Sequence, residues 1–344
     1  MSEHGPFVNL LLARLKEFIR EPEVIFWVFG FPVLLAVGLG IAFRNRPPDR
    51  IAVGVVDGPG ASAIIGALPG AEGFDVRKIP PGEAAADLRL GRVALVVVPG
   101  DAWEYRYDPT RPDSLLARQK VDDALQRSAG REDPVRPRET LVVEPGARYI
   151  DFLIPGLLGM NIMSGGMWGV GFVLVEMRSR KLLKRLVATP MRRSDFLAAM
   201  MASRMILVFL ELVLLLLFGW LVFDVVIMGS LATILLLSVL GAFVFAALGL
   251  FVASRARKIE TVSGLMNLVM LPMFVFSGIF FSSDRFPGVL QPLVKALPLT
   301  ALNDALRATI LEGAGLASQT GRVAVMLVWG ALSFVLAIRF FRWT

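Results

Sequence analysis

The chain has no cysteine and a single histidine, His4, among its 344 residues. The absence of cysteine excludes disulfides, Cys-ligated zinc sites and a thiolate nucleophile. One histidine cannot form a metal cluster of imidazoles, and its place in the N-terminal tail argues against a His-based triad. No GxxxxGK[ST] or GxSxG sequence occurs, and no GxGxxG follows an expected strand. We therefore expect no metal site, no catalytic residues and no nucleotide-binding loop on this chain.

Positive charge is in excess, but only in part of the chain. Residues 44–148 hold 16 basic and 16 acidic side chains, whereas the rest holds 20 basic and 13 acidic ones. The rest is also strongly apolar, and the whole chain is 55% hydrophobic with a mean hydropathy of +0.65. This pattern argues against a nucleic-acid partner and predicts a polytopic membrane protein with a positive cytoplasmic side.

Six apolar runs are long enough to cross a bilayer, the last one only if flanking residues join it. They are Val24–Phe43, Phe152–Val175, Met205–Phe223, Val225–Ala253, Thr261–Ser283 and Val323–Ile338. Pro32 predicts a kink in the first run. The preceding segment, Phe7–Arg20, has an apolar side and a charged side, which predicts a helix in the membrane interface. A plain cytosolic extension is the alternative.

Residues 44–148 change in composition to a charged, Pro- and Gly-containing segment. Four β-branched or alternating stretches predict strands, and three further stretches predict helices. The strands are Ile51–Asp57, Phe74–Ile79, Arg92–Pro99 and Trp103–Asp108; the helices are Ala61–Leu68, Gly82–Leu90 and Ser114–Ser128. The order βαβαββα predicts one small α/β domain inserted between spans one and two.

The loop Glu176–Arg204 holds eight Lys and Arg side chains between two apolar runs, and such loops stay cytoplasmic. With six spans, both termini are then cytoplasmic and residues 44–148 are extracytoplasmic. Outside the α/β domain, 16 Lys and Arg fall on the cytoplasmic side and four on the other. We expect a multi-pass protein of the cell (inner) membrane.

The order of these parts, with two quoted segments, resembles the permease subunit of type-2 ABC exporters. The segments are EMRSRKLLKRLVATPMRR (176–193) and FSGIFFSSDRFPGVLQPLVKALPLTALNDALRATILEG (276–313). The resemblance is to the subgroup with a large external domain between spans one and two. It implies a polytopic α-helical membrane protein with six transmembrane helices and an inserted extracytoplasmic α/β domain. Its parts would be 1–43 (amphipathic helix and span one), 44–148 (external domain) and 149–344 (spans two to six).

The resemblance also implies that loop 176–204 couples the chain to an ABC ATPase subunit. ATP and Mg would be bound by that partner, and this chain would bind no cofactor. The implied coupling residues are Glu176, Arg178, Lys181, Lys184, Arg185, Pro190, Arg192 and Arg193. The alternative is a solvated basic loop that only obeys the positive-inside rule.

Two further groups of residues follow from the resemblance. Residues 284–310 would form a re-entrant hairpin that closes the exit, with Phe286, Pro287, Pro292, Pro298, Asn303 and Arg307; an ordinary structured loop is the alternative. Candidate residues of the substrate path are Met160, Asn161, Ser164, Glu211, Asn267, Met270 and Phe274.

Two features of the spans leave alternatives open. The intramembrane carboxylate Glu211 could contact a cationic substrate group, pair with a basic residue, or stay protonated and hydrogen-bonded. Gly165-x-x-x-Gly169 could form a dimer face or serve packing within one subunit.

The function that follows is export of a hydrophobic or amphipathic, drug- or lipid-like compound, with ATP hydrolysed by a separate subunit. The expected partners are that ATPase, a second permease copy or homologue, membrane lipid and, through the external domain, a periplasmic partner. A non-transporting membrane sensor or mechanotransmitter, with the external domain as receptor, is the alternative. The substrate and the choice between homodimer and heterodimer stay open, and a membrane-embedded enzyme is disfavoured.

Overall fold

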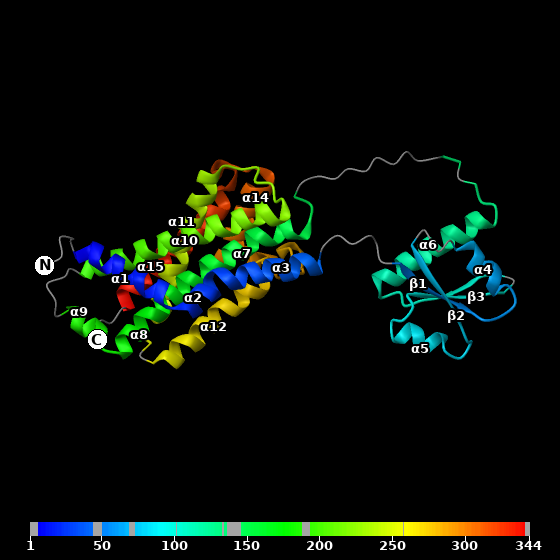
Figure 1. Ribbon diagram of the computed structural model, residues 1–344, viewed down its shortest axis with the longest axis horizontal. Helices are drawn as coiled ribbons and strands as arrows, with labels where there is room; N and C mark the ends of the chain where they lie inside the picture. The colour runs from blue at the N-terminus through cyan, green and yellow to red at the C-terminus, as the bar shows by residue number, and fades with distance from the viewer. Residues whose placement is uncertain are drawn as a thin grey trace. The chain divides into compact units, whose positions relative to one another are not determined.

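The computed structural model describes residues 6–43, 50–68, 73–100, 102–132, 134–135, 146–187, 193–256 and 258–340. The chain forms two compact units (Figure 1). One contains Met1–Arg44 and Val143–Thr344, and we call it the membrane unit; the other, Asn45–Val142, is the α/β unit. The α/β unit corresponds to the domain expected at 44–148, with slightly different ends.

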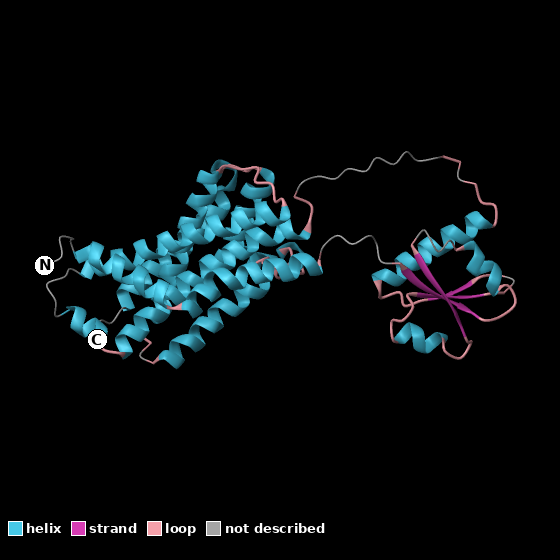
Figure 2. Ribbon diagram, viewed as in Figure 1, coloured by secondary structure: helices cyan, strands magenta, loops and turns pink. Residues whose placement is uncertain are grey.

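The α/β unit contains a four-stranded sheet of order β2-β1-β3-β4. The first three strands are parallel and β4 is antiparallel to β3. The strands are β1 (Ile51–Val56), β2 (Phe74–Ile79), β3 (Leu95–Val98) and β4 (Glu104–Arg106). The helices are α4 (Ala61–Ala67), α5 (Ala84–Arg89) and α6 (Pro112–Ser128). This is the βαβαββα order that the sequence predicts, and all described strands lie in this unit (Figure 2).

Both faces of the sheet are covered because side chains alternate along β1. Val53 and Val55 pack with residues of α4 and α6, including Ile64 and Val121. Val56, on the other face, packs with Ile79, with Val96 and with Ala84 of α5. A parallel sheet needs such cover on both faces, so the unit has its own core and is built as a separate domain.

The membrane unit is entirely helical among its described residues (Figure 2). Its first part contains α1 (Pro6–Arg20), α2 (Pro22–Ile25), the π-helix η1 (Phe26–Gly30) and α3 (Phe31–Ala42). Then follow α7 (Tyr149–Gly166), the π-helix η2 (Met167–Phe172), α8 (Val173–Ser179), α9 (Leu182–Val187) and α10 (Arg193–Phe223). The last part contains α11 (Leu231–Ala253), α12 (Ile259–Phe276), η3 (Ser283–Arg285), α13 (Gln291–Ala296), α14 (Pro298–Glu312), η4 (Leu316–Gln319) and α15 (Thr320–Phe340).

Six helical stretches of the described chain are long and apolar enough to cross a membrane, which agrees with the six predicted spans. They are Pro22–Ala42, Tyr149–Ser179, Ala198–Phe223, Leu231–Ala253, Ile259–Phe276 and Leu316–Phe340. Large apolar side chains such as Leu268, Val328 and Ile338 are more than 60% exposed on these helices. Such a surface suits lipid rather than water. The protein is a multi-pass α-helical membrane protein.

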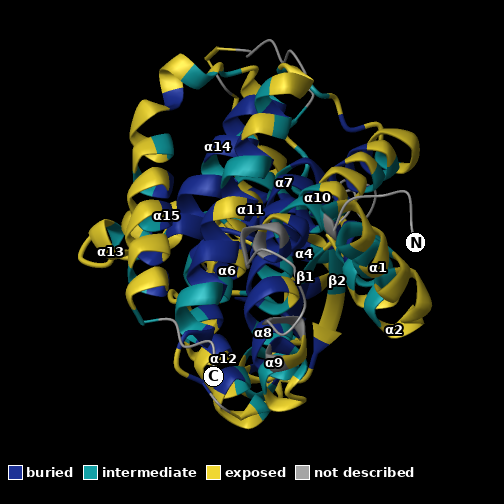
Figure 3. Cartoon of the chain, turned by 90° about the vertical axis from the view of Figure 1, so that its left-hand side faces the viewer, coloured by how far each residue is buried: buried dark blue, intermediate teal, exposed yellow. Residues whose placement is uncertain are grey.

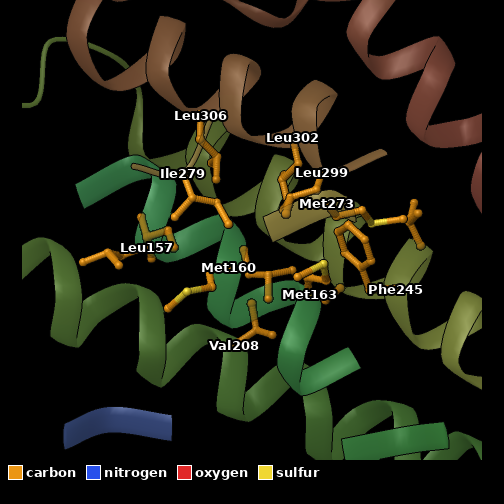
Figure 4. Packing of buried hydrophobic residues seen from close by; sticks show 14 of the residues in the cluster. Leu157, Met160, Met163, Val208, Phe245, Met273, Ile279, Leu299, Leu302 and Leu306 are labelled. Carbon is orange, nitrogen blue, oxygen red and sulfur yellow. The ribbon is translucent and has the colours of Figure 1, made fainter. Parts of the chain in front are cut away.

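Spans two and four form the centre of the membrane unit. In the most apolar part of these two spans, 67% and 61% of the residues are buried, compared with 17–33% in the other four spans. The helix α14 packs against both, and its side chains Leu299, Leu302 and Leu306 complete the core (Figures 3 and 4). Glycines allow the close approach of spans two and four, because a Cβ on Gly171 would overlap the backbone of Gly249.

Two predicted span boundaries are wrong. Span four begins at Leu231 rather than Val225, because the preceding segment runs along α14. There the amide of Met228 donates to the carbonyl of Ile310, 2.8 Å away, and a Cβ on Gly229 would overlap the carbonyl of Thr309. The fifth span ends at Phe276 rather than Ser283, where the chain turns through Gly278 with φ of 69°. Apolar composition alone does not distinguish these non-helical segments from membrane helix.

Candidate functional site

An arginine near the end of span two fixes this end of the helix to span four. The guanidinium of Arg178 donates to the carbonyls of Ala253 and Ala256, at 3.1 and 2.7 Å. These carbonyls lie at and just beyond the C-terminus of α11, where a helix lacks internal donors. Arg178 therefore fixes the end of span two to the end of span four, and Glu176 pairs with Arg180 one turn away at 2.8 Å.

The short helix α9 follows a sharp turn. Lys181 has a positive φ of 58°, which reverses the chain between α8 and α9. Leu183 of α9 is buried with Leu174, Phe196 and Met200, and Leu10 of α1 packs on the same cluster. Arg185 is exposed. The helices α1, α8 and α9 thus gather at one end of the membrane unit, with a buried side on α9 and an exposed basic side (Figure 1).

The predicted coupling residues are distributed over this segment in different ways. Lys181 and Arg185 are exposed, whereas Glu176 and Arg178 are half-buried and engaged within the chain. Lys184 lies within α9, and Arg193 is the first residue of α10. Pro190 and Arg192 lie outside the described residues. Arg178 thus takes a structural position, and the outward-facing candidates are Lys181 and Arg185.

A buried ion pair joins Glu211 to Arg204 on α10. Two guanidinium nitrogens of Arg204 lie 2.7 and 3.1 Å from the two carboxylate oxygens of Glu211, and the side chains are 4% and 1% exposed. The same guanidinium donates to the backbone carbonyl of Asn161 on α7, at 3.3 Å. A Cβ on Gly165 would overlap the guanidinium, so the missing side chain there makes room for Arg204.

This arrangement corresponds to the pairing alternative among the three that the sequence leaves open for Glu211. Gly165 accommodates an arginine of its own chain, which fits the alternative of packing within one subunit. Sequence reasoning treated Arg204 only as the end of the basic loop. The sequence separation of Arg204 and Glu211 could have indicated the pair. Seven residues are about two helical turns, so the two side chains lie on one face of the helix.

The residues proposed for a substrate path do not share one surface. Met160 and Met270 lie in the main core, and Asn161 and Glu211 are buried as well. Ser164 and Phe274 are half-buried, and Asn267 is exposed on α12. In the single chain, therefore, the residues of this set that reach the surface are Ser164, Asn267 and Phe274.

The predicted hairpin contains two helices, α13 and α14, and α14 packs deep in the unit. Asn303 of α14 is fully buried and donates to the carbonyl of Ser277 at 2.7 Å. Its side-chain oxygen faces Gly159, where a Cβ would overlap it. Asn303 thus joins α14 to span two and to the turn after span five.

Arg307 secures the same helix one turn later. Its guanidinium donates to the carbonyls of Gly278 and Phe152, at 2.8 and 3.3 Å, and stacks over the Phe152 ring at 3.6 Å. It also lies 3.5 Å from Asp304. Asn303 and Arg307 therefore both attach α14 to spans two and five.

The remaining hairpin residues have separate positions. Phe286 contacts the rings of Phe276 and Phe281, with centroids 5.0 and 6.0 Å apart. Pro287 and Pro292 are exposed, while Pro298 is buried at the start of α14, where a helix needs no amide donor. Pro292 and Pro298 thus lie at the beginnings of the two helices, and Pro287 lies in the loop before α13.

Comparisons with known proteins agree with this architecture. The family model "ABC-2 type transporter" matches residues 121–311, more than half of the chain. "ABC transporter G family member 20" of Dictyostelium discoideum is 28% identical over 200 residues, 58% of this chain and 27% of that protein. "Linearmycin resistance permease protein LnrN" of Bacillus subtilis is 23% identical over 176 residues, 51% of this chain and 46% of that protein.

A further relative is "Inner membrane transport permease YhhJ" of Escherichia coli, 27% identical over 123 residues, 36% of this chain and 33% of that protein. The matches cover less than half the length of each of these relatives. The match to the family model extends from α6 through all of α13 and most of α14 and includes the segment 176–204. The chain belongs to the ABC-2 type transporter family of type-2 ABC permeases, which are transmembrane components of ABC transporters.

Proposed function

We propose that this chain is the permease subunit of an ABC exporter that moves a hydrophobic or amphipathic, drug- or lipid-like compound. It acts as a pair with a second copy or a homologue, and two ATPase subunits hydrolyse the ATP. The observation that supports this most directly is how α9 is attached to the spans. Its residue Leu183 is buried in the membrane unit, and the preceding Arg178 is bonded to the end of span four. A movement of this short helix can therefore be transmitted to spans two and four together.

The exposed side of α9 supplies the docking surface. Arg185 and the preceding Lys181 are exposed, and neither forms an ion pair within the described residues. Exposed basic side chains steer and orient an acidic partner surface. We assign them to the ATPase, with Lys184, Pro190, Arg192 and Arg193 as further coupling residues and Glu176 and Arg178 as their support.

The proposed topology follows from which residues share an end of the membrane unit. Arg255 stacks on Phe340 at 4.7 Å, and Arg178 reaches Ala256, so the loop after span four and the end of span six lie with α9. Tyr149 contacts Phe43 and Phe280 at the opposite end. The first end holds the Lys- and Arg-rich segments, so we place it in the cytoplasm of an inner-membrane protein, with the α/β unit outside.

The substrate path in this proposal lies between two permease copies. Ser164, Asn267 and Phe274 reach the surface of the single chain and are the residues best placed to line it. The buried candidates Met160, Asn161, Glu211 and Met270 pack beneath the residues that line this path. The hairpin residues around Asn303 and Arg307 close its outer end, and the α/β unit is available to a periplasmic partner.

Co-purification tests the coupling surface. The full chain is purified from membranes with an ABC ATPase encoded beside its gene, and the ATPase that remains bound is quantified by mass spectrometry. Arg185→Glu is compared with Lys258→Glu, a matched charge reversal at an exposed residue at the start of α12. We expect ATPase to be lost only from Arg185→Glu. Equal retention in both variants contradicts the assignment of α9, and the absence of any ATPase partner favours the sensor alternative.

Transport itself needs a separate measurement. Proteoliposomes with the permease and ATPase are loaded with ATP on the ATPase side, and the efflux of fluorescent amphiphiles is followed. Stimulation of ATP hydrolysis by an amphiphile, together with its movement, supports the exporter. Coupled ATP hydrolysis that no substrate stimulates would instead identify a mechanotransmitter.

A further inference from the structure

A cavity of about 540 Å³ lies at the end of the membrane unit where the chain enters α7. It is bounded by α13, α14, η3 and the first turns of α15, with Phe152 of α7 at one side. Six charged side chains line it, three acidic and three basic: Asp284, Asp304, Glu312, Lys295, Arg307 and Arg322. Of these six residues, only Arg307 belongs to the residues proposed to close the exit.

One pair of these charges belongs to the scaffold. Arg307 is occupied by Asp304, by two backbone carbonyls and by the ring of Phe152. The other four, Asp284, Lys295, Glu312 and Arg322, are exposed. None of the four forms an ion pair within 4.0 Å in the described part of the chain. The cavity therefore presents two acidic and two basic groups that have no ion-pair partner among the described residues, around a fixed pair.

The balance of charge restricts the ligand. A site for an anion or a cation would carry an excess of the opposite sign, whereas this cavity carries equal numbers. A zwitterion that has both charges a few ångströms apart satisfies both sets. Its cation is better a primary ammonium than a quaternary one, because carboxylates accept its N–H bonds, whereas quaternary groups are held by aromatic cages. Phe152, the one aromatic residue at the described wall, is already covered by Arg307.

The surroundings favour a lipid over a soluble zwitterion. Val325 lines the cavity one turn along α15 from Arg322. Beyond it, Leu327 and Val328 are 53% and 64% exposed on the same helix. A headgroup in the cavity would thus have an apolar helix surface leading away from it, along which acyl chains can lie. Thr300, which also lines the cavity, has a buried hydroxyl without a partner among the described residues.

We propose that this cavity binds the headgroup of a zwitterionic phospholipid that carries a primary ammonium and a phosphate, as phosphatidylethanolamine does. The ammonium lies against Glu312 and Asp284, and the phosphate against Arg322 and Lys295. The site is separate from the α9 surface, and it shares the hairpin residue Arg307 with the proposed outer end of the path. It is a lipid site on the permease alone, and its occupancy requires neither ATPase nor transport.

Binding to the full-length protein in detergent tests this directly. The protein is titrated with short-chain phosphatidylethanolamine, or with phosphatidylcholine or phosphatidylglycerol of the same chain length. Bound lipids are counted by native mass spectrometry. Charge-assisted hydrogen bonds to the primary ammonium give an expected preference of about tenfold for phosphatidylethanolamine over phosphatidylcholine. Free phosphoethanolamine, added as competitor, should displace the lipid only at far higher concentration.

Two variants and one control assign the binding to the cavity. Arg322→Gln and Glu312→Gln each remove one free charge at an exposed position, so both should fold and both should lose the preference. Arg285→Gln removes an exposed charge beside Asp284 that does not line the cavity, and it should retain the preference. Equal binding of the two zwitterionic lipids, tighter binding of phosphatidylglycerol, or an unchanged preference in both variants overturns the proposal. Free phosphoethanolamine binding as tightly as the lipid overturns the lipid assignment.

Discussion

The side-chain amide of Asn161 in span two donates a hydrogen bond to the backbone carbonyl of Val28 in span one, 2.9 Å away. Val28 lies four residues before Pro32, which has no amide hydrogen, so the usual helical donor to this carbonyl is missing. Asn161 replaces it from the neighbouring helix. Since the carbonyl of Asn161 accepts from Arg204, one residue connects the proline break in span one to the ion pair in span three.

Asn161→Ala should lower stability, because the carbonyl of Val28 then loses its donor from the neighbouring helix. Interhelical hydrogen bonds in membranes contribute about 1 kcal/mol, so we expect a modest fall in the thermal unfolding midpoint in detergent. Asn267→Ala is the matched control, since Asn267 is exposed on α12. Equal midpoints for Asn161→Ala and the native protein would show that Val28 finds another donor.

Removing one partner of the buried ion pair should cost far more than removing both. Glu211→Gln leaves Arg204 charged and without its carboxylate, which costs roughly 3–5 kcal/mol for a buried pair. The double variant Arg204→Met, Glu211→Leu replaces both charges with apolar groups and should recover most of the loss. Thermal unfolding of Arg204→Met, of Glu211→Leu and of the double variant that combines them gives the coupling. A Glu211→Gln protein as stable as the native one is incompatible with the pair as described.

Close packing of spans two and four should tolerate no side chain at Gly171. A Cβ there would lie 2.6 Å from the carbonyl carbon of Gly249, so backbone must move to admit it. Gly264→Ala is the control, because a Cβ at that position meets nothing within 4 Å. We expect Gly171→Ala to lower the unfolding midpoint and the yield of folded protein. Gly264→Ala should be neutral or stabilising by up to about 1 kcal/mol, since alanine favours helix.

The absence of cysteine makes the proposed topology simple to test. Lys258→Cys and Arg285→Cys each introduce the only thiol of the chain at an exposed residue. A membrane-impermeant maleimide should label Arg285→Cys in intact cells and Lys258→Cys only after the membrane is opened. Labelling in the reverse order would place the α9 surface outside the cytoplasm, and the coupling proposal would then fail.

Tyr105 should lose its phenolic proton at a higher pH than an ordinary tyrosine. Burial, together with its hydrogen bond to Asp122, raises the pKa of Tyr105 above the ordinary 10.0. The folded α/β unit therefore favours the protonated phenol, and this contribution to stability is complete below about pH 10 and falls as the pH rises further. Absorbance at about 295 nm, compared between native protein and Tyr105→Phe, isolates this one phenol. A difference spectrum that titrates near pH 10 would show that the side chain is not perturbed.

The sequence predicts the span number and the order of the α/β unit well, because both rest on strong local patterns. A run of twenty apolar residues has few alternatives to a membrane helix, and the β-branched stretches of β1 and β3 suit buried parallel strands. Pro32 predicts a kink in span one, because proline lacks the amide hydrogen that a helix uses. Local composition could not reveal that a residue more than a hundred positions away donates to the carbonyl four residues before this proline.

The site was predictable only where one residue's own chemistry determines its position. Glu211 stands out because a carboxylate in an apolar run needs a partner. The resemblance implies a coupling role for Arg178, and it does not indicate that the hydrogen bonds of Arg178 go to the end of α11. The cavity beside α14 gathers charges from four separate elements, and no segment of the sequence shows them together.

The two π-helical stretches, η1 and η2, have a consequence for the phase of spans one and two. A π-turn holds one residue more than an α-turn, so the helix beyond it is rotated by about 100° relative to an uninterrupted α-helix. The side chains of α8 are therefore oriented by the extra residue of η2 as much as by their own sequence. Deleting one residue within Met167–Phe172 could be absorbed locally by reverting to α-helix. The same deletion in α7 would turn the side chains between the deleted residue and η2 away from their neighbours.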